Sequence, residues 1–230
     1  MKVFLSAALL LFAFSSAAAA QDERRFLDAK LVRAEGKAAE DFVPRGWVLE
    51  EQATGDLNGD ALPDAALRLI EDLPPEAADG TWNMRHRALV LIFKRADGAY
   101  ARAAVATRVL YCSLCGGALS DPSGGNLAVS IEKGVLNVFQ LSGAREAHEL
   151  TQRFRYDPRA KRFALIGEDV ETYDRADGDG TKTSTNYLTG LQVTEKRRLL
   201  KEGQEPKLVS TTRKKITAPR RFIEDIDYEQ

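Results

Sequence analysis

The sequence has few of the residues from which catalytic and metal centres are most often built. It contains two cysteines and two histidines among 230 residues. A serine or cysteine nucleophile needs a nearby base, and no local signature such as Gly-x-Ser-x-Gly marks one here. We therefore predict that the protein is not an enzyme. A pair of carboxylates that hydrolyses glycosides leaves no trace in local spacing, so such a hydrolase remains an alternative.

The chain also lacks an excess of one charge and, after residue 20, any long apolar run. Lys and Arg total 33 and Asp and Glu total 34, which gives no electrostatic sign of a nucleic-acid partner. Residues 1–20, MKVFLSAALLLFAFSSAAAA, have the layout of a secretory signal peptide. We expect cleavage after Ala20 and a periplasmic or secreted protein that begins near Gln21. The apolar stretch is short of the ~20 residues that cross a bilayer, so no stable membrane insertion is expected after signal removal.

No amphipathic run of helical length follows the signal. Residues 21–46 form a polar N-terminal segment, in which we expect one short helix near residues 36–42. From residue 47 on, short apolar stretches alternate with turn residues, which is typical of strands. Hairpin tips are predicted near residues 97, 133, 159 and 178, and the hairpin over 87–107 is the clearest. The pattern predicts a single all-β domain over 47–230, an antiparallel meander of about 8–11 strands arranged as propeller-like blades, a curled sheet or a sandwich.

The loop GDLNGDALPD over residues 55–64 carries oxygen-bearing groups at every second position. Counted from its first aspartate, positions one, three, five, seven and nine are Asp56, Asn58, Asp60, the Leu62 carbonyl and Asp64. This spacing can enclose Ca²⁺, which takes about 6 to 8 oxygen ligands. Position twelve is leucine rather than the glutamate of an EF-hand. The alternative is an Asx-rich turn whose side chains bond their own backbone.

The loop resembles the calcium loop of FG-GAP and VCBS-type β-repeats, the integrin-propeller motif that lies between two strands. Together with CGGALSDP, FRYDPRAKRFALIGED and STNYLTG, it makes the chain similar to exported bacterial FG-GAP-like β-proteins of unassigned function. The resemblance implies an exported all-β domain with a calcium site at these five loop residues, and it does not indicate any particular activity. Such loops have Gly at position six, where this chain has Ala61. We therefore expect a left-handed backbone there that weakens the site.

Two other stretches are rich in charge. Residues 173–183, YDRADGDGTKT, offer Asp174, Asp177 and Asp179, whose spacing fits a solvated hairpin tip better than a second cation site. Residues 196–221 contain ten Lys or Arg against two Glu. A solvated terminal hairpin accounts for them, and a basic patch for anionic envelope polymers is the alternative.

Both cysteines lie in YCSLCGGALSDPSGG, and in an exported protein we expect a Cys112–Cys115 disulfide. Redox-active thiols are an alternative, although the Gly-rich stretch is a poor start for the helix that activates such thiols. A four-ligand zinc site with His86 and His148 is a third possibility. We interpret both histidines as surface residues, because charged residues surround them.

These observations predict a non-catalytic exported β-domain with a structural calcium loop, which binds a protein or polysaccharide of the cell envelope. The alternatives are a secreted hydrolase with a carboxylate pair and a periplasmic inhibitor or immunity-type protein. A pocket with two or more ionisable groups away from the calcium loop would favour the hydrolase. A protruding rigid loop, such as residues 112–125, with no pocket beneath it would favour the inhibitor.

Overall fold

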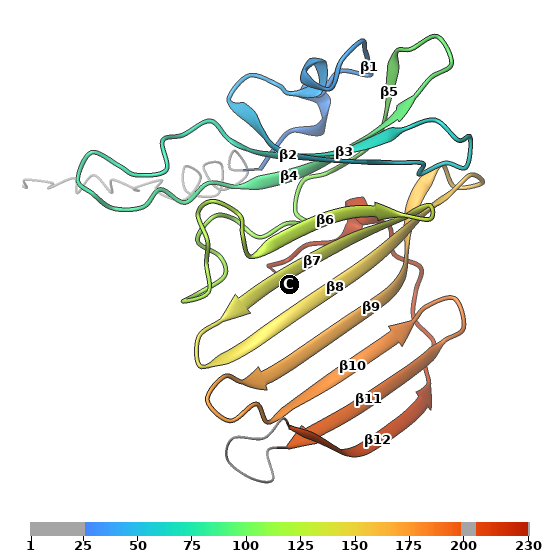
Figure 1. Cartoon of the computed structure of the whole chain (residues 1–230). Helices are drawn as coiled ribbons and strands as arrows, with labels where there is room; N and C mark the ends of the chain where they lie inside the picture. Colours follow the sequence, from blue (N-terminus) through green and yellow to red (C-terminus); the bar gives the residue numbers. More distant parts are fainter. Residues whose placement is uncertain (1–25, 199–205, 230) are drawn as a thin grey trace, which may run out of the picture.

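The computed structural model describes residues 26–198 and 206–229 as strands, short 3₁₀ helices and loops. The predicted signal peptide over residues 1–20 and its cleavage point lie outside the described residues. The strands form two antiparallel sheets, so the fold is all-β as predicted (Figure 1). Within the described ranges, no helix is long and apolar enough to cross a membrane.

The first sheet has five strands in the order β1-β5-β4-β3-β2. Their bounds are β1 (Glu35–Gly36), β2 (Trp47–Gly55), β3 (Asp64–Glu71), β4 (Arg87–Lys94) and β5 (Tyr100–Ala106). The central strands β3 and β4 are buried on both faces. This explains why their sequences, AALRLI and RALVLI, do not alternate between apolar and polar residues.

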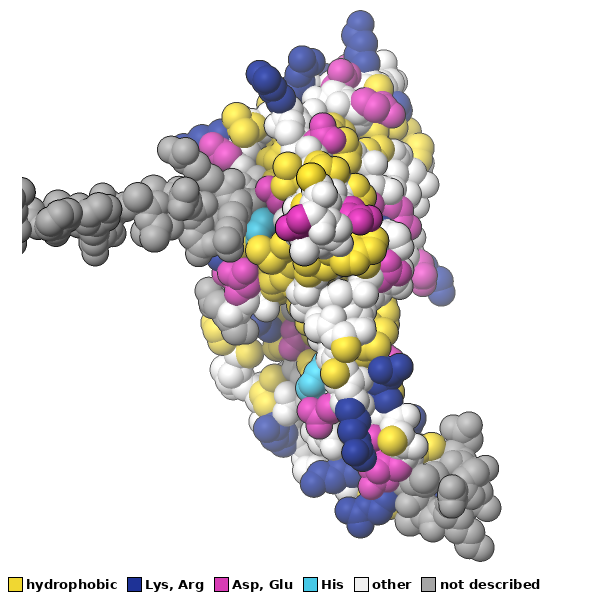
Figure 2. Space-filling view, turned by 90° about the vertical axis from the view of Figure 1, so that its left-hand side faces the viewer, with side chains coloured by type: hydrophobic (Ala, Val, Ile, Leu, Met, Phe, Trp, Pro, Cys, Tyr) yellow, Lys and Arg dark blue, Asp and Glu magenta, His cyan; other side chains and the backbone are white. Residues whose placement is uncertain are grey.

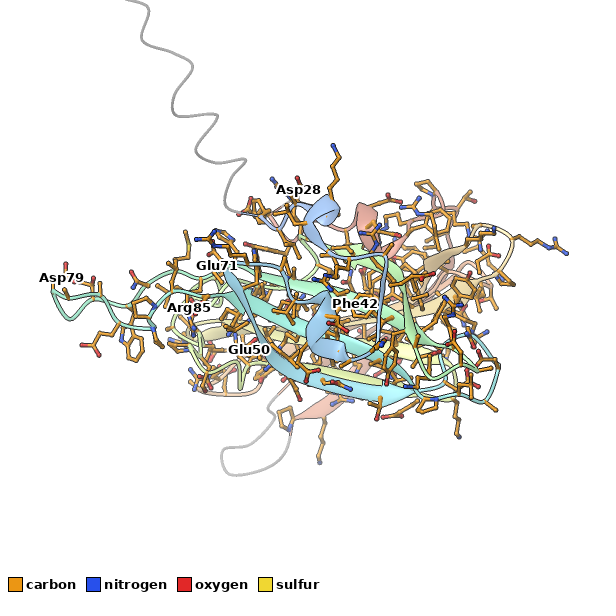
Figure 3. All side chains as sticks on the ribbon, turned by 90° about the horizontal axis from the view of Figure 1, so that it is seen from above. Asp28, Phe42, Glu50, Glu71, Asp79 and Arg85 are labelled. Carbon is orange, nitrogen blue, oxygen red and sulfur yellow. A yellow bond between two sulfur atoms is a disulfide. The ribbon has the colours of Figure 1, made fainter. Side chains whose placement is uncertain are left out.

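The N-terminal segment covers the outer face of the five-stranded sheet. It contains η1 (Ala29–Leu31) and η2 (Ala39–Phe42), and Phe42 packs fully buried over the sheet (Figure 3). The helix predicted near residues 36–42 is therefore a single 3₁₀ turn. The Asp41 carboxylate accepts hydrogen bonds from the backbone N–H groups of Lys37 and Ala38, which fixes the entry to this turn.

The second sheet is a seven-stranded meander in chain order from β6 to β12. Its strands are β6 (Leu127–Glu132), β7 (Val135–Gly143), β8 (Glu146–Asp157), β9 (Arg162–Asp174), β10 (Gly180–Asn186), β11 (Leu191–Arg198) and β12 (Lys207–Lys215). The predicted hairpin tips near residues 97, 133, 159 and 178 all fall between paired strands. At the tightest one, Lys133 and Gly134 have φ values of 50° and 76°, as a two-residue hairpin turn requires.

The main core lies between the two sheets. Leu89 and Leu91 of β4 meet Val138 of β7, Phe154 of β8 and Phe163 of β9, all fully buried. Within the described ranges, β11 and β12 contribute nothing to this core, and every residue of β12 is exposed. The outer strands therefore extend beyond the packed part of the molecule (Figure 1).

The finer topology differs from the sequence prediction in two ways. The described ranges contain twelve strands rather than 8–11, and the two-residue β1 is too short to carry an apolar pattern. Both sheets are open, with the strand orders given above. Propeller-like blades and a curled sheet are therefore not what the chain forms.

After β12 the chain crosses back to the core as a C-terminal segment over residues 216–229. It contains η3 (Ile223–Asp225), and Ile223 is fully buried between the sheets. The backbone N–H of Leu165 donates to the carbonyl of Arg221, and that of Tyr228 donates to the carbonyl of Arg108. The segment thus ties β9 to the connection that follows β5.

Candidate functional site

The predicted calcium loop joins β2 to β3. Asp56 accepts hydrogen bonds from the backbone N–H groups of Gly59 at 2.6 Å and Ala61 at 2.9 Å. Asp60 accepts from the N–H of Leu62 at 2.8 Å and from the Asn58 side-chain amide at 3.0 Å. Ala61 has a φ of 65°, so the left-handed backbone expected at position six is present.

Asp64 differs from the other loop aspartates because it is fully buried. Its carboxylate accepts hydrogen bonds from the N–H groups of Leu57 and Lys94, both at 2.8 Å. Burial raises the pKa of the Asp64 carboxyl, and the negative charges of Asp60 and Asp56 raise it further. A nearby divalent cation would lower the cost of keeping this carboxyl ionised.

The loop residues fit Ca²⁺ in chemistry but not in their present arrangement. The oxygen donors belong to the types that calcium prefers. Their carboxylates, however, bond to backbone N–H groups, and among the described residues no three acidic, histidine or cysteine side chains are grouped to hold a metal ion. The geometry agrees with the Asx-rich turn, and calcium binding remains a prediction.

If the loop binds calcium, the ion will raise the melting temperature. A concentration tenfold above Kd adds about 1.4 kcal/mol to the free energy of unfolding, or about 3 to 6 °C in Tm. Asp60→Ala should abolish this rise, and Ala61→Gly should enlarge it by removing the strained backbone. Thermal melting at increasing Ca²⁺ measures both. An equal rise in Asp60→Ala, or none in the parent protein at millimolar calcium, would contradict the prediction.

The second acidic stretch lies in the turn between β9 and β10, where a hairpin tip is predicted. Asp174 accepts hydrogen bonds from the N–H of Ala176 at 2.7 Å and from the Arg145 side chain at 2.6 Å. Asp177 accepts from the N–H of Asp179 at 3.0 Å. These contacts organise the turn without a cation.

The predicted disulfide between Cys112 and Cys115 is present, so neither sulfur is available to a zinc ion. His148 is a partly exposed strand residue, as expected, and its ring lies 3.1 Å from the Thr172 hydroxyl. The prediction for His86 is wrong, because this residue is only 3 % exposed. Its ring packs 4.7 Å from that of Phe26, and its Nδ1 lies 3.5 Å from the Tyr228 hydroxyl.

Sequence reasoning also missed a buried ionic cluster formed by Glu50, Arg68 and Arg87. The Arg87 Nε lies 2.8 Å from the Glu50 carboxylate, and the Arg68 Nε lies 2.8 Å from the same oxygen. Arg68 also pairs with Glu51 at 2.7 Å. The sequence feature that could have predicted this cluster is the arginine in each of the apolar strands β3 and β4. A charge buried in such a strand needs a buried partner of opposite charge.

The connection between β3 and β4 forms a projecting acidic hairpin, defined here as residues 71–84. It contains four acidic residues and neither Lys nor Arg. Three of its large apolar side chains are exposed: Leu73 by 47 %, Trp82 by 55 % and Met84 by 40 %. The hairpin extends away from both sheets, with Asp79 at its outer end and Glu71 at its base (Figures 1 and 3). Viewed end on, acidic side chains flank apolar ones (Figure 2).

Internal hydrogen bonds hold the acidic hairpin in shape. The N–H of Asn83 donates to the carbonyl of Pro75, and its side chain donates to the carbonyl of Pro74, both at 2.8 Å. Near the tip, Asp79 accepts from the N–H and hydroxyl of Thr81. At the base, the Glu71 carboxylate accepts from the N–H of His86 at 2.7 Å. The exposed apolar groups are therefore presented on an ordered element.

A cavity of about 330 Å³ lies between the seven-stranded sheet and the C-terminal segment. Its acidic groups are all paired. Glu168 accepts from the Gln152 amide at 2.9 Å, and Asp227 pairs with Arg108 at 2.9 Å. The Arg162 side chain, which donates to Asp225, is the main cause of the lowered pKa of the Asp225 carboxyl.

The loop over residues 112–125 is bound to its surroundings on both sides. Near its start, the N–H of Ser113 donates to the carbonyl of Arg85 at 2.9 Å. Further along, the Arg85 side chain donates to the carbonyl of Pro122 at 3.1 Å. The projecting element with exposed apolar side chains is therefore the acidic hairpin.

No protein-family model, curated protein or solved structure matches this chain. The similarity to exported FG-GAP-like proteins stays an expectation drawn from the loop residues.

Proposed function

We propose that the chain is a non-catalytic exported β-domain that binds another protein of the cell envelope through the acidic hairpin. The observation that carries this proposal is the exposure of Trp82, Leu73 and Met84 on an ordered, projecting element. Exposed apolar groups of this kind mark interaction sites, and tryptophan is enriched among the residues that dominate binding energy.

The charge of the acidic hairpin specifies the chemistry of its partner. The hairpin carries four carboxylates and has no Lys or Arg of its own, and the neighbouring Arg85 side chain donates to the Leu73 carbonyl at its base. A complementary surface is therefore an apolar groove with Lys or Arg at its rim. A projecting hairpin fits into such a groove better than it lies along a polysaccharide. This favours a protein over a polysaccharide and is the geometry expected of an inhibitor or immunity-type protein.

Calcium would have a structural role in this proposal. The predicted calcium loop precedes β3 and the acidic hairpin follows it, so the two lie at opposite ends of that strand (Figure 1). An ion at the loop would not touch a protein bound to the hairpin. It would instead stabilise the β2–β3 connection.

A secreted hydrolase is the second candidate, since the cavity beneath the C-terminal segment contains Glu168, Asp225 and Asp227. A general acid needs a carboxyl with a raised pKa, whereas the pKa of Asp225 is lowered by Arg162. Asp227 is held by Arg108, and Glu168 by Gln152. These pairings leave the cavity a weaker basis for function than the acidic hairpin.

Trp82→Ala should weaken binding to the envelope partner by at least about 30-fold, as expected for a buried aromatic anchor. The matched control is Leu188→Ala, which truncates a side chain that is 64 % exposed in the turn between β10 and β11. Envelope proteins captured on the parent, Trp82→Ala and Leu188→Ala proteins are compared by quantitative mass spectrometry. Each candidate is then purified and titrated calorimetrically.

A partner lost with Trp82→Ala and kept with Leu188→Ala supports the proposal. A partner that binds all three proteins equally, or one lost only with Leu188→Ala, contradicts it. Thermal melting of both variants controls for unfolding, and little change is expected because both side chains are exposed.

A further inference from the structure

We propose that the Cys112–Cys115 pair is a thiol–disulfide exchange site, which external dithiols enter at Cys115. This inference is independent of the acidic hairpin as a binding element. It rests on unequal access to the two sulfurs, on a turn held by other bonds, and on a hydrogen-bond donor placed at the more accessible sulfur.

The two cysteines differ in exposure. Cys112 is 1 % exposed and belongs to the buried core, whereas Cys115 is partly exposed. Of the two residues that follow, Gly116 is buried and Gly117 is exposed. An incoming thiolate therefore reaches the sulfur of Cys115 more readily than that of Cys112.

The turn that carries the disulfide is held by backbone hydrogen bonds. The N–H of Cys115 donates to the carbonyl of Cys112 at 3.2 Å. Before it, Ser113 bonds to Arg85, and after it the N–H of Gly143 donates to the carbonyl of Gly116 at 3.0 Å. These contacts do not depend on the sulfur–sulfur bond. They should keep the two thiols adjacent after reduction and ready to close again.

The disulfide itself contributes little to stability, because it closes a very short loop. Cys112 and Cys115 are separated by 3 positions in the sequence. The entropy removed from the unfolded chain grows with loop length, so this cross-link lies near the low end of the ~0 to 5 kcal/mol range. Its reduction is therefore compatible with an intact fold.

A hydrogen-bond donor stands beside Cys115. The Tyr228 hydroxyl lies 3.6 Å from the Cys115 sulfur and 3.5 Å from Nδ1 of the buried His86. Burial, with the charges of Glu229 and Asp227, raises the pKa of Tyr228 well above its usual range. The phenol therefore keeps its one proton, for which the Cys115 sulfur, the His86 Nδ1 and the Glu229 carboxylate are the neighbouring acceptors. A thiolate accepts such a bond more strongly than a disulfide sulfur does, so Tyr228 favours the reduced state.

The exchange is a two-step transfer of two electrons. A thiolate of the external dithiol attacks the Cys115 sulfur, the Cys112–Cys115 bond breaks, and Cys112 leaves as a thiolate that takes up a proton. The second thiol of the dithiol then loses its proton and attacks the external sulfur of the mixed disulfide. This step releases the Cys115 thiolate, which is protonated in turn. The external dithiol is oxidised to a disulfide and the protein is reduced to a dithiol.

Single-cysteine variants test the point of entry. In Cys112→Ser the remaining thiol is Cys115, and in Cys115→Ser it is Cys112. We expect the first variant to react with a small aromatic disulfide reagent at least about tenfold faster than the second, since access controls this rate. Equal rates, or a faster reaction of Cys115→Ser, would overturn the assignment of Cys115.

Redox titration of the whole protein tests reversibility and the role of Tyr228. Dithiothreitol and a reduced Cys-x-x-Cys peptide serve as separate dithiol probes, which distinguish a small-molecule reductant from a polypeptide. Tyr228→Phe should shift the equilibrium toward the disulfide by about threefold to tenfold. Tyr111→Phe is the matched control, because its ring packs 5.6 Å from that of Tyr228.

Circular dichroism follows the fold during the titration. Reversible reduction by either probe with the fold intact, and a shift confined to Tyr228→Phe, support the proposal. If reduction requires denaturant, or if both phenylalanine variants shift the equilibrium equally, the disulfide is only a structural cross-link. None of these outcomes depends on whether the acidic hairpin binds a partner.

Discussion

Glu50→Ala is expected to lower the free energy of unfolding by about 3 to 5 kcal/mol, because it leaves two buried guanidinium groups without their shared carboxylate. Arg87 is fully buried and Arg68 nearly so, and both lie 2.8 Å from the same Glu50 oxygen. Arg68 keeps Glu51 as a second ion-pair partner, whereas Arg87 keeps a hydrogen bond to the Tyr111 carbonyl at 3.3 Å and the more distant charge of Asp121. Urea unfolding followed by circular dichroism measures the change.

A double variant separates the charge effect from lost packing. Glu50→Leu alone leaves the buried Arg87 charge without its carboxylate partner. Glu50→Leu combined with Arg87→Met replaces the ion pair by apolar groups of similar size. Such replacements are often neutral, so the double variant should be more stable than Glu50→Leu. If the double variant is as unstable as the sum of its two single variants, the cluster does not act through its buried charge.

Asp64→Ala should destabilise the protein by about 2 to 6 kcal/mol, even without calcium. The Asp64 carboxylate is the acceptor for the buried N–H of Leu57 and for that of Lys94. Removing it leaves both donors unsatisfied, and each such group costs about 1 to 3 kcal/mol. The experiment is done in a chelator so that the loss of a metal site cannot contribute.

Asp60→Ala is the matched control in the same loop. Asp60 is exposed and bonds only within the loop, so its removal should cost less than about 1 kcal/mol when no calcium is present. Equal destabilisation by Asp64→Ala and Asp60→Ala would show that the buried carboxylate of Asp64 contributes no more to stability than the exposed carboxylate of Asp60. It would also show that the hydrogen bond from the Lys94 N–H of β4 to Asp64 of β3 adds little stability.

The strands, the turns and the disulfide could be read from the sequence because local chemistry fixes them. Lys133-Gly134 and the Ala-Asp-Gly turn near residue 97 each specify a hairpin from their own residues. The Cys112–Cys115 pairing is predicted from the presence of two cysteines in a chain that is expected to be exported, and the disulfide is present. The left-handed backbone of Ala61 follows from its place in the loop. None of these features needs a residue distant in the chain.

The division into two sheets and the buried polar groups depend on contacts between distant residues, so only the tertiary structure decided them. A meander pattern does not say that pairing stops after β5 and restarts at β6, because that break comes from packing β4 against β7 and β8. The arginines beside His86 in the sequence predict a surface residue, but in the structure His86 packs against Phe26 and the Tyr228 hydroxyl. Arg87 stands in an apolar strand, but its partner in the core is Glu50, which lies 37 residues earlier in the chain and is identified only by the structure. Burial is a property of the assembled chain, whereas turn and strand preferences belong to a few neighbouring residues.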